Sequence, residues 1–79
     1  MKLANDTQYG LAAYIFTNDL TTAIYAAERL EVGGVGVNMN DVVEMQAPFG
    51  GWKESGLGYE LSHRGLEEYQ EIKHIHLGL

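Results

Sequence analysis

The sequence predicts an α/β fold built on one parallel βαβ unit, followed by a glycine-rich loop, a C-terminal helix and a terminal strand. Three observations support this prediction. An apolar and aromatic run, Tyr9–Phe16, precedes a segment with helical spacing, and a second short apolar run, Val35–Asn38, follows that segment. Strand, helix and strand in this order form a right-handed crossover in nearly all known cases. The chain has only 79 residues, so the unit and its extensions make at most one small domain.

The first run carries few polar residues, which is typical of a strand covered on both faces. Polar residues at 17–19 then offer turn and N-cap chemistry. From Asp19 to Glu31 the apolar residues change to helical spacing. Gly33 and Gly34 are expected to end this helix, because glycine accepts a left-handed backbone. The apolar stripe of the helix consists of Leu20, Ala23, Ile24, Ala27 and Leu30.

Residues 40–60 are predicted to form one long glycine-rich loop, because no strand or helix period runs through them. Ser62 is expected to cap a helix over residues 63–72, with Leu66, Tyr69 and Ile72 on its apolar side. Residues 73–79 alternate between apolar and other side chains, which predicts a half-buried strand. Its apolar face would carry Ile75, Leu77 and Leu79, and its other face His74 and His76.

This layout predicts an incomplete structure. Two parallel strands and one helix leave a sheet face and two sheet edges uncovered, and an isolated two-stranded sheet is marginal in water. Unpaired edges bind other strands. The chain has no cysteine, so neither a disulfide nor a thiolate zinc site can supply stability. We therefore expect the chain to be part of a larger sheet or one protomer of an assembly.

Composition excludes several classes of function. The formal net charge is −6 and the five basic residues are scattered, which argues against binding to nucleic acid or to anionic membranes. No apolar run approaches the roughly 20 residues that cross a bilayer. Met1 is followed closely by Asn5 and Asp6, which leaves no hydrophobic core for a signal peptide. A cytoplasmic location is the resulting expectation.

Most candidate reactive groups have a simpler structural interpretation. His74 and His76 could form half of a metal site, but no third ligand has suitable spacing. The acidic residues at 67, 68 and 71 lie opposite an apolar stripe and indicate a solvated helix face. Ser55 lacks a nucleophile elbow, and no glycine cluster follows a strand and opens a helix as a dinucleotide site requires. Phe49, Trp52 and Val43 either line an apolar pocket or anchor the loop, and the sequence supports both interpretations equally.

Five segments of the chain resemble the C-terminal part of NAD(P)-dependent aldehyde dehydrogenases, in the order and spacing of that family. The most specific is the loop A-P-F-G-G-W-K-E-S-G-L-G, and one departure is Tyr59, where the family usually places arginine. Met1 falls where the family has the end of a preceding helix, so a truncated start is expected. The five segments are Ala4–Ala13, Phe16–Leu20, Gly34–Asn38, Ala47–Gly58 and Gly65–Lys73.

The resemblance implies a fragment of an oxidoreductase that converts an aldehyde to an acid with NAD or NADP. In that family the catalytic cysteine, the catalytic glutamate and the cofactor domain lie upstream, so no catalytic residue, bound cofactor or metal is expected here, and the fragment alone should be inactive. By position in the motif, the resemblance assigns the lining of the substrate pocket to Phe49, Val43 and Asp41. Some members carry an aromatic residue where this chain has Val43, so the pocket would be roomier here. The same argument assigns loop support to Asn38, Pro48, Gly50, Gly51, Ser55, Gly56 and Gly58.

The resemblance also divides the chain by role. Residues 1–60 would belong to the catalytic-domain sheet and the substrate loop, and residues 61–79 would form a helix and an oligomerisation strand that uses Ile75, Leu77 and Leu79. The expected partner is a second copy or the rest of the enzyme. Two alternatives stay open: a free-standing assembly or regulatory module that pairs with full-length dehydrogenases through its strand edges, and a small independent ligand-binding domain.

Overall fold

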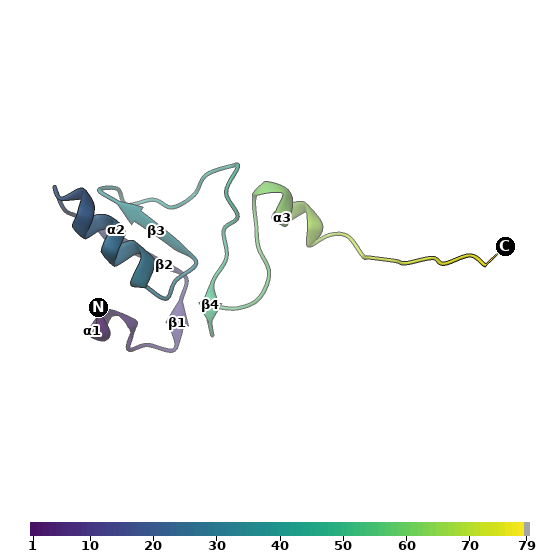
Figure 1. Cartoon of the computed structure of the whole chain (residues 1–79), viewed down its shortest axis with the longest axis horizontal. Coiled ribbons are helices and arrows are strands. Elements are labelled where there is room, and N and C mark those ends of the chain that lie inside the picture. The colour runs from purple at the N-terminus through teal and green to yellow at the C-terminus, as the bar shows by residue number, and fades with distance from the viewer. Residues whose placement is uncertain (79) are drawn as a thin grey trace.

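The computed structural model describes residues 1–78, which form an elongated molecule of 62 × 25 × 19 Å. The N-terminal half is a small group of strands and helices, and the C-terminal end projects away from it as an extended chain (Figure 1). The elements, in chain order, are α1 (Lys2–Asn5), β1 (Tyr9–Gly10), β2 (Ala12–Ile15), α2 (Leu20–Arg29), β3 (Gly34–Val37), β4 (Trp52–Lys53) and α3 (Ser62–Glu67).

The predicted βαβ unit is present. β2 and β3 pair in parallel, with Ala12 opposite Gly34 and Ile15 opposite Val37. α2 connects them and packs against β2, where Ala23 lies buried. The α/β character of the fold is therefore confirmed at the level of these three elements.

The first strand and the loop differ from the prediction. The run Tyr9–Phe16 is interrupted at Leu11, because its two halves have different partners: β1 pairs antiparallel with β4, and β2 pairs with β3. The segment 40–60 is accordingly not a plain loop. It contains β4, and Phe49 and Glu60 exchange two backbone hydrogen bonds of 2.8 Å in an isolated antiparallel bridge.

α2 begins where the sequence predicts but ends earlier. The Asp19 carboxylate accepts a hydrogen bond of 2.9 Å from the Thr22 amide and another from the Thr22 hydroxyl, which caps the helix. The helix ends at Arg29 because Leu30 has an extended backbone, φ −74° and ψ 126°. Termination by Gly33 and Gly34 is thus wrong, and Gly34 instead opens β3.

α3 is shorter than predicted, and the terminal strand does not form. α3 spans Ser62–Glu67, its N-cap is Leu61, and Ser62 is its first residue rather than its cap. Gly65 weakens the helix from within, while Ile72 is fully exposed beyond its end. Residues 73–78 have no partner strand and no regular structure, since an extended segment needs a neighbouring edge to become a strand. Leu79 lies outside the described residues.

The hydrophobic core of the described chain is very small. Among residues 1–78 only one hydrophobic side chain, that of Ala23, is buried, with 3% of its surface exposed. The accessible surface is 6838 Å², whereas a compact protein of 8.7 kDa exposes about 4,700 Å². The radius of gyration is 16.8 Å, against about 12 Å for a compact chain of this length. Within residues 1–78 no helix is both long enough and apolar enough to cross a membrane.

Candidate functional site

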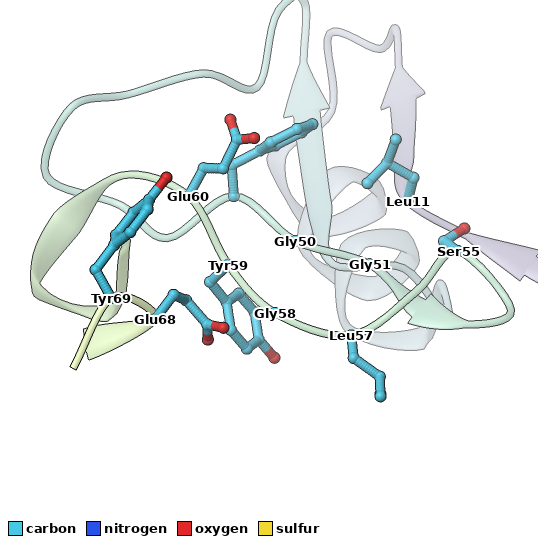
Figure 2. A pocket seen from close by; sticks show the side chains of 11 residues that line it. Leu11, Gly50, Gly51, Ser55, Leu57, Gly58, Tyr59, Glu60, Glu68 and Tyr69 are labelled. Carbon is cyan, nitrogen blue, oxygen red and sulfur yellow. The ribbon is translucent and has the colours of Figure 1, made fainter. Parts of the chain in front are cut away.

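The glycine-rich loop and the two residues that follow the C-terminal end of α3 line an open hollow of about 360 Å³. Figure 2 shows it from close by, with Leu11 and Ser55 at one end and Glu60 and Tyr69 at the other. The Glu68 carboxylate lies beside the Gly58 backbone, because a β-carbon there would come within 3.1 Å of Glu68 Oε2. Its lining residues are Leu11, Phe49, Gly50, Gly51, Ser55, Leu57, Gly58, Tyr59, Glu60, Glu68 and Tyr69.

Glycines allow the loop to fold this tightly. Gly56 and Gly58 have φ of +116° and +85°, values that residues with a β-carbon rarely adopt. A β-carbon on Gly50 would overlap the ring of Tyr59 and approach the carbonyl oxygen of Gly58 to 2.7 Å. The loop is also tied to the sheet, because the Gly10 amide donates a hydrogen bond of 2.8 Å to Ser55 Oγ.

The lining determines what the hollow can do chemically. Leu11, Phe49 and Leu57 provide apolar surface, and Glu60 and Glu68 provide carboxylates, but no basic side chain belongs to the lining that the structure describes. The chain has no cysteine and therefore no thiol nucleophile. The hollow can thus form one wall of a pocket for an uncharged group, while thiol chemistry would require a cysteine from elsewhere.

Half of the residues proposed for the loop and pocket meet at this hollow. Of the ten residues assigned to pocket lining or loop support, the lining includes Phe49, Gly50, Gly51, Ser55 and Gly58.

The other five proposed residues lie elsewhere. Asp41 and Val43 belong to the segment that passes over β3, where the Asp41 carboxylate accepts a 2.8 Å hydrogen bond from the Val43 amide. Val43 is 52% exposed, so its part in a pocket stays a prediction. The remaining three are Asn38, Pro48 and Gly56.

Asn38 supports the sheet directly. Its amide oxygen accepts from the Thr17 backbone nitrogen and its amide nitrogen donates to the Thr17 carbonyl oxygen, both at 2.9 Å. Its own backbone nitrogen donates to Ile15 at 2.7 Å. Asn38 therefore continues the β2–β3 ladder beyond its last residue with a side chain, and its φ of 55° is one that asparagine tolerates well.

Sequence reasoning missed the side of the hollow that follows the loop. Tyr59 was noted only as a departure from the family pattern, and Glu68 was assigned to a solvated helix face. Both line the hollow because the Phe49–Glu60 bridge turns the chain back on itself. An isolated pair of bridging residues leaves no periodic signal in a sequence. Trp52, grouped with Phe49 in the sequence, lies instead on β4 and is half exposed.

The other candidate centres gain no support as sites. The rings of His74 and His76 stack with centroids 6.1 Å apart, and residues 1–78 contain no cluster of three or more metal-ligating side chains. A dinucleotide phosphate would normally lie at the turn between β2 and α2. That turn contains no glycine, and the Asp19 carboxylate occupies the helix N-terminus, where it would repel a phosphate. These residues do not fit a dinucleotide.

Comparison with known proteins identifies the same family that the motifs resemble. Residues 1–75 match the model of the aldehyde dehydrogenase family. An aldehyde dehydrogenase of Aspergillus niger is 49% identical over 79 residues, which is all of this chain and 16% of that protein. The NADP⁺-linked succinate-semialdehyde dehydrogenase of Escherichia coli is 50% identical over 76 residues, 96% of this chain and 16% of that protein.

Solved structures give the same result. Succinate-semialdehyde dehydrogenase from Burkholderia pseudomallei superposes with a TM-score of 0.80 at 50% identity, over 86% of this chain and 14% of that one. Betaine aldehyde dehydrogenase from Staphylococcus aureus, solved with NAD⁺, gives a TM-score of 0.82 at 47% identity, over 86% and 14%. The chain thus spans about a sixth of the length of the curated relatives it matches.

Proposed function

This chain belongs to the aldehyde dehydrogenase family, and we propose that it is the C-terminal segment of an enzyme that oxidises an aldehyde to a carboxylic acid with NAD or NADP. The observation that carries the proposal is that a chain with a nearly full-length family match has too large an accessible surface area for a compact protein. The chain matches the family along almost its whole length, yet it exposes about 2,100 Å² more than a compact protein of its mass. A segment that belongs inside a larger enzyme has that property.

In this proposal residues 1–60 contribute to the catalytic-domain sheet and to the wall of the aldehyde pocket. Phe49 supplies apolar surface at that wall, and Val43 and Asp41 lie nearer the pocket entrance. The catalytic cysteine and glutamate and the residues that hold the dinucleotide come from the remaining five-sixths of the enzyme, in keeping with the absence of cysteine here. The enzyme would be cytoplasmic, as expected from the acidic composition of this chain.

Residues 61–79 form the oligomerisation part of the proposal. Ile75 and Leu77 are each 71% exposed on an extended segment that projects from the body, as Figure 1 shows. Exposed apolar side chains at every second position are what a strand presents before it joins a sheet edge. A second subunit would supply that edge.

The decisive experiment is a chimera. The matching 76-residue segment of the Escherichia coli enzyme is replaced by this chain, and turnover is measured with succinate semialdehyde and NADP⁺. We expect turnover within about tenfold of the parent, since half of the residues in the exchanged segment are identical. A well-folded chimera without turnover would contradict the proposal, as would aldehyde oxidation by the isolated 79-residue chain.

The exposed tail also favours a second candidate, a free module that pairs with full-length dehydrogenases. Light scattering of the isolated chain mixed with the Escherichia coli enzyme distinguishes the two. A stable complex with the complete enzyme supports the module, because a segment that the enzyme already contains has no vacant position to fill. Absence of a complex, together with an active chimera, supports the enzyme segment.

A further inference from the structure

Lys53 on β4 joins three parts of the chain that are far apart in sequence. Its Nζ donates to the carbonyl oxygen of Asn5 at 3.0 Å and to that of Thr7 at 3.3 Å, and it forms an ion pair of 2.8 Å with Glu31 Oε2. An ammonium group has three donors, and three oxygens surround this one. The Lys53 side chain is 27% exposed, so solvent only partly replaces these contacts.

Asn5 completes the arrangement from the other side. Its amide nitrogen donates to the Arg29 carbonyl oxygen at 2.8 Å, and its amide oxygen accepts from the Glu31 backbone nitrogen at 2.9 Å. One side chain therefore satisfies two backbone groups where α2 ends. Asn5, Glu31 and Lys53 form a closed polar cluster, which we call the clasp.

The clasp fixes a turn that lies against the glycine-rich loop. The turn consists of residues 31–33, and the Gly33 amide donates to the Gly10 carbonyl oxygen at 3.1 Å. A β-carbon on Gly33 would overlap the carbonyl oxygen of Gly50, so the two backbones are in direct contact. Gly50 is the neighbour of Phe49. Any shift of the turn therefore moves the loop at the position where the pocket wall is formed.

The backbone of Lys53 supports a specific use of its side chain. Its φ is 53°, in the left-handed region that costs a residue with a β-carbon about 1 kcal/mol. Glycine would adopt this conformation without that cost. A lysine that keeps it while its ammonium group meets three oxygens indicates that the contacts outweigh the strain.

From this geometry we propose that Lys53 is a positioning residue: through the clasp it holds the turn 31–33 against Gly50 and so sets the place of Phe49 in the aldehyde pocket. This inference rests on the proposed function, because it assumes that Phe49 contacts the aldehyde. The substrate property that Lys53 controls is bulk. A long or branched aldehyde needs the wall in one place, whereas a short aldehyde makes little contact with it.

The test uses the active chimera with Lys53→Met, which keeps the length of the side chain but removes its charge and its donors. We expect KM for a bulky aldehyde to rise about fivefold and kcat to change less than twofold, the pattern of a lost binding contact. KM for a short aldehyde should change less. Lys53→Arg keeps the charge and donors and should recover most of the KM. Lys2→Met, at an exposed lysine of α1, is the matched control.

A second readout keeps the two proposals separate. Hydrogen exchange measured by mass spectrometry on the same chimera reports the loop whether or not the protein turns over. Lys53→Met should speed exchange of the Phe49 amide, which donates to the Glu60 carbonyl oxygen, and leave β2 and β3 protected. Unchanged exchange and an unchanged ratio of the two KM values would overturn the clasp. An equal loss for all aldehydes with a lower Tm would reduce Lys53 to a stabilising residue, and an inactive chimera contradicts only the proposed function.

Discussion

The two ends of this chain are built differently. Residues 1–55 are connected by long-range hydrogen bonds, including those of Asn5 to the end of α2, of Asn38 to Thr17 and of Gly10 to Ser55. Residues 66–78 are connected, in the described hydrogen bonds, only to their own neighbours, such as Tyr69 to Leu66. The first region is therefore held together by its own hydrogen bonds. The second makes no described long-range hydrogen bond and would need the surface of another chain or domain to become ordered. The hollow lies between them and takes lining residues from both.

The comparison is tested most strongly by removing apolar contacts from the tail. In the active chimera, Ile75→Asp combined with Leu77→Asp places two charges where a strand would meet a second subunit. We expect the oligomer to dissociate and turnover to fall by more than about tenfold, because ionised side chains are costly to bury in an interface. Light scattering measures the mass, and circular dichroism checks that the fold persists.

The other face of the same segment supplies the control. His74→Asn combined with His76→Asn changes two residues within the same stretch, and their rings stack on each other. This variant should keep the mass and the turnover of the chimera. If it dissociates as readily as the aspartate variant, or if neither does, the tail is not an oligomerisation strand with Ile75 and Leu77 at its interface.

The next largest effect is expected on the unfolding free energy when Gly33, in the first region, is replaced by alanine. Gly33→Ala places a methyl group where the carbonyl oxygen of Gly50 lies. Because backbone is in the way and no flexible side chain can move, we expect a loss of about 1–3 kcal/mol in unfolding free energy. Gly78→Ala adds the same methyl group at a position with no neighbouring atom within the described chain itself, and should change the unfolding free energy far less. Urea unfolding of both chimeras measures the difference, and equal stabilities would mean that the turn and the loop are not in contact.

The contrast between the regions also explains what the sequence could predict. The βαβ unit follows from local patterns: apolar runs at β2 and β3, and Asp19 before the helical stripe. These elements form because each has its partner within 30 residues. The break at Leu11 was not predictable from pattern, because it depends on β4, which lies about 40 positions further along the chain.

The candidate site was predictable in part for a similar reason. Motif resemblance places Phe49, Gly50 and Ser55 in one loop, and the structure brings them to one hollow. Tyr59 and Glu68 reach it only through the Phe49–Glu60 bridge, which no periodicity reveals. The terminal strand failed for the opposite reason. The alternation at residues 73–79 indicates that the segment can form a strand. A strand needs a neighbouring sheet edge, and the described chain offers none to residues 73–78.

A smaller change in stability is expected from a substitution at Asn38, which lies at the end of the β2–β3 ladder. Asn38→Ala removes both hydrogen bonds to Thr17 and leaves a β-carbon at φ 55° without the polar group that makes this conformation tolerable. We expect a loss of about 1 kcal/mol, because the site is exposed and water replaces part of the bonding. Asn40→Ala, on an exposed neighbour, should change little. A Tm unchanged by Asn38→Ala would show that the ladder ends at Val37.

The smallest expected effect concerns Asp19, where the direction of the pKa shift is clear. Hydrogen bonds from the Thr22 hydroxyl and the Thr22 amide lower the pKa of the Asp19 carboxyl below its ordinary value of 3.8. Because the folded pKa lies below the unfolded one, the cap stabilises α2 fully above about pH 4 and loses this contribution as the pH falls through the folded value.

Carboxyl NMR titration of the chain should therefore give a pKa below 3.8 for Asp19. Thr22→Val removes the hydroxyl donor and should move that pKa back towards the ordinary value, whereas Thr21→Val, whose side chain makes no described contact with Asp19, should leave it unchanged. A normal Asp19 pKa in the unmodified chain would mean that α2 is not capped in solution, and the ordered region would then lose the helix start that its sequence predicts most directly.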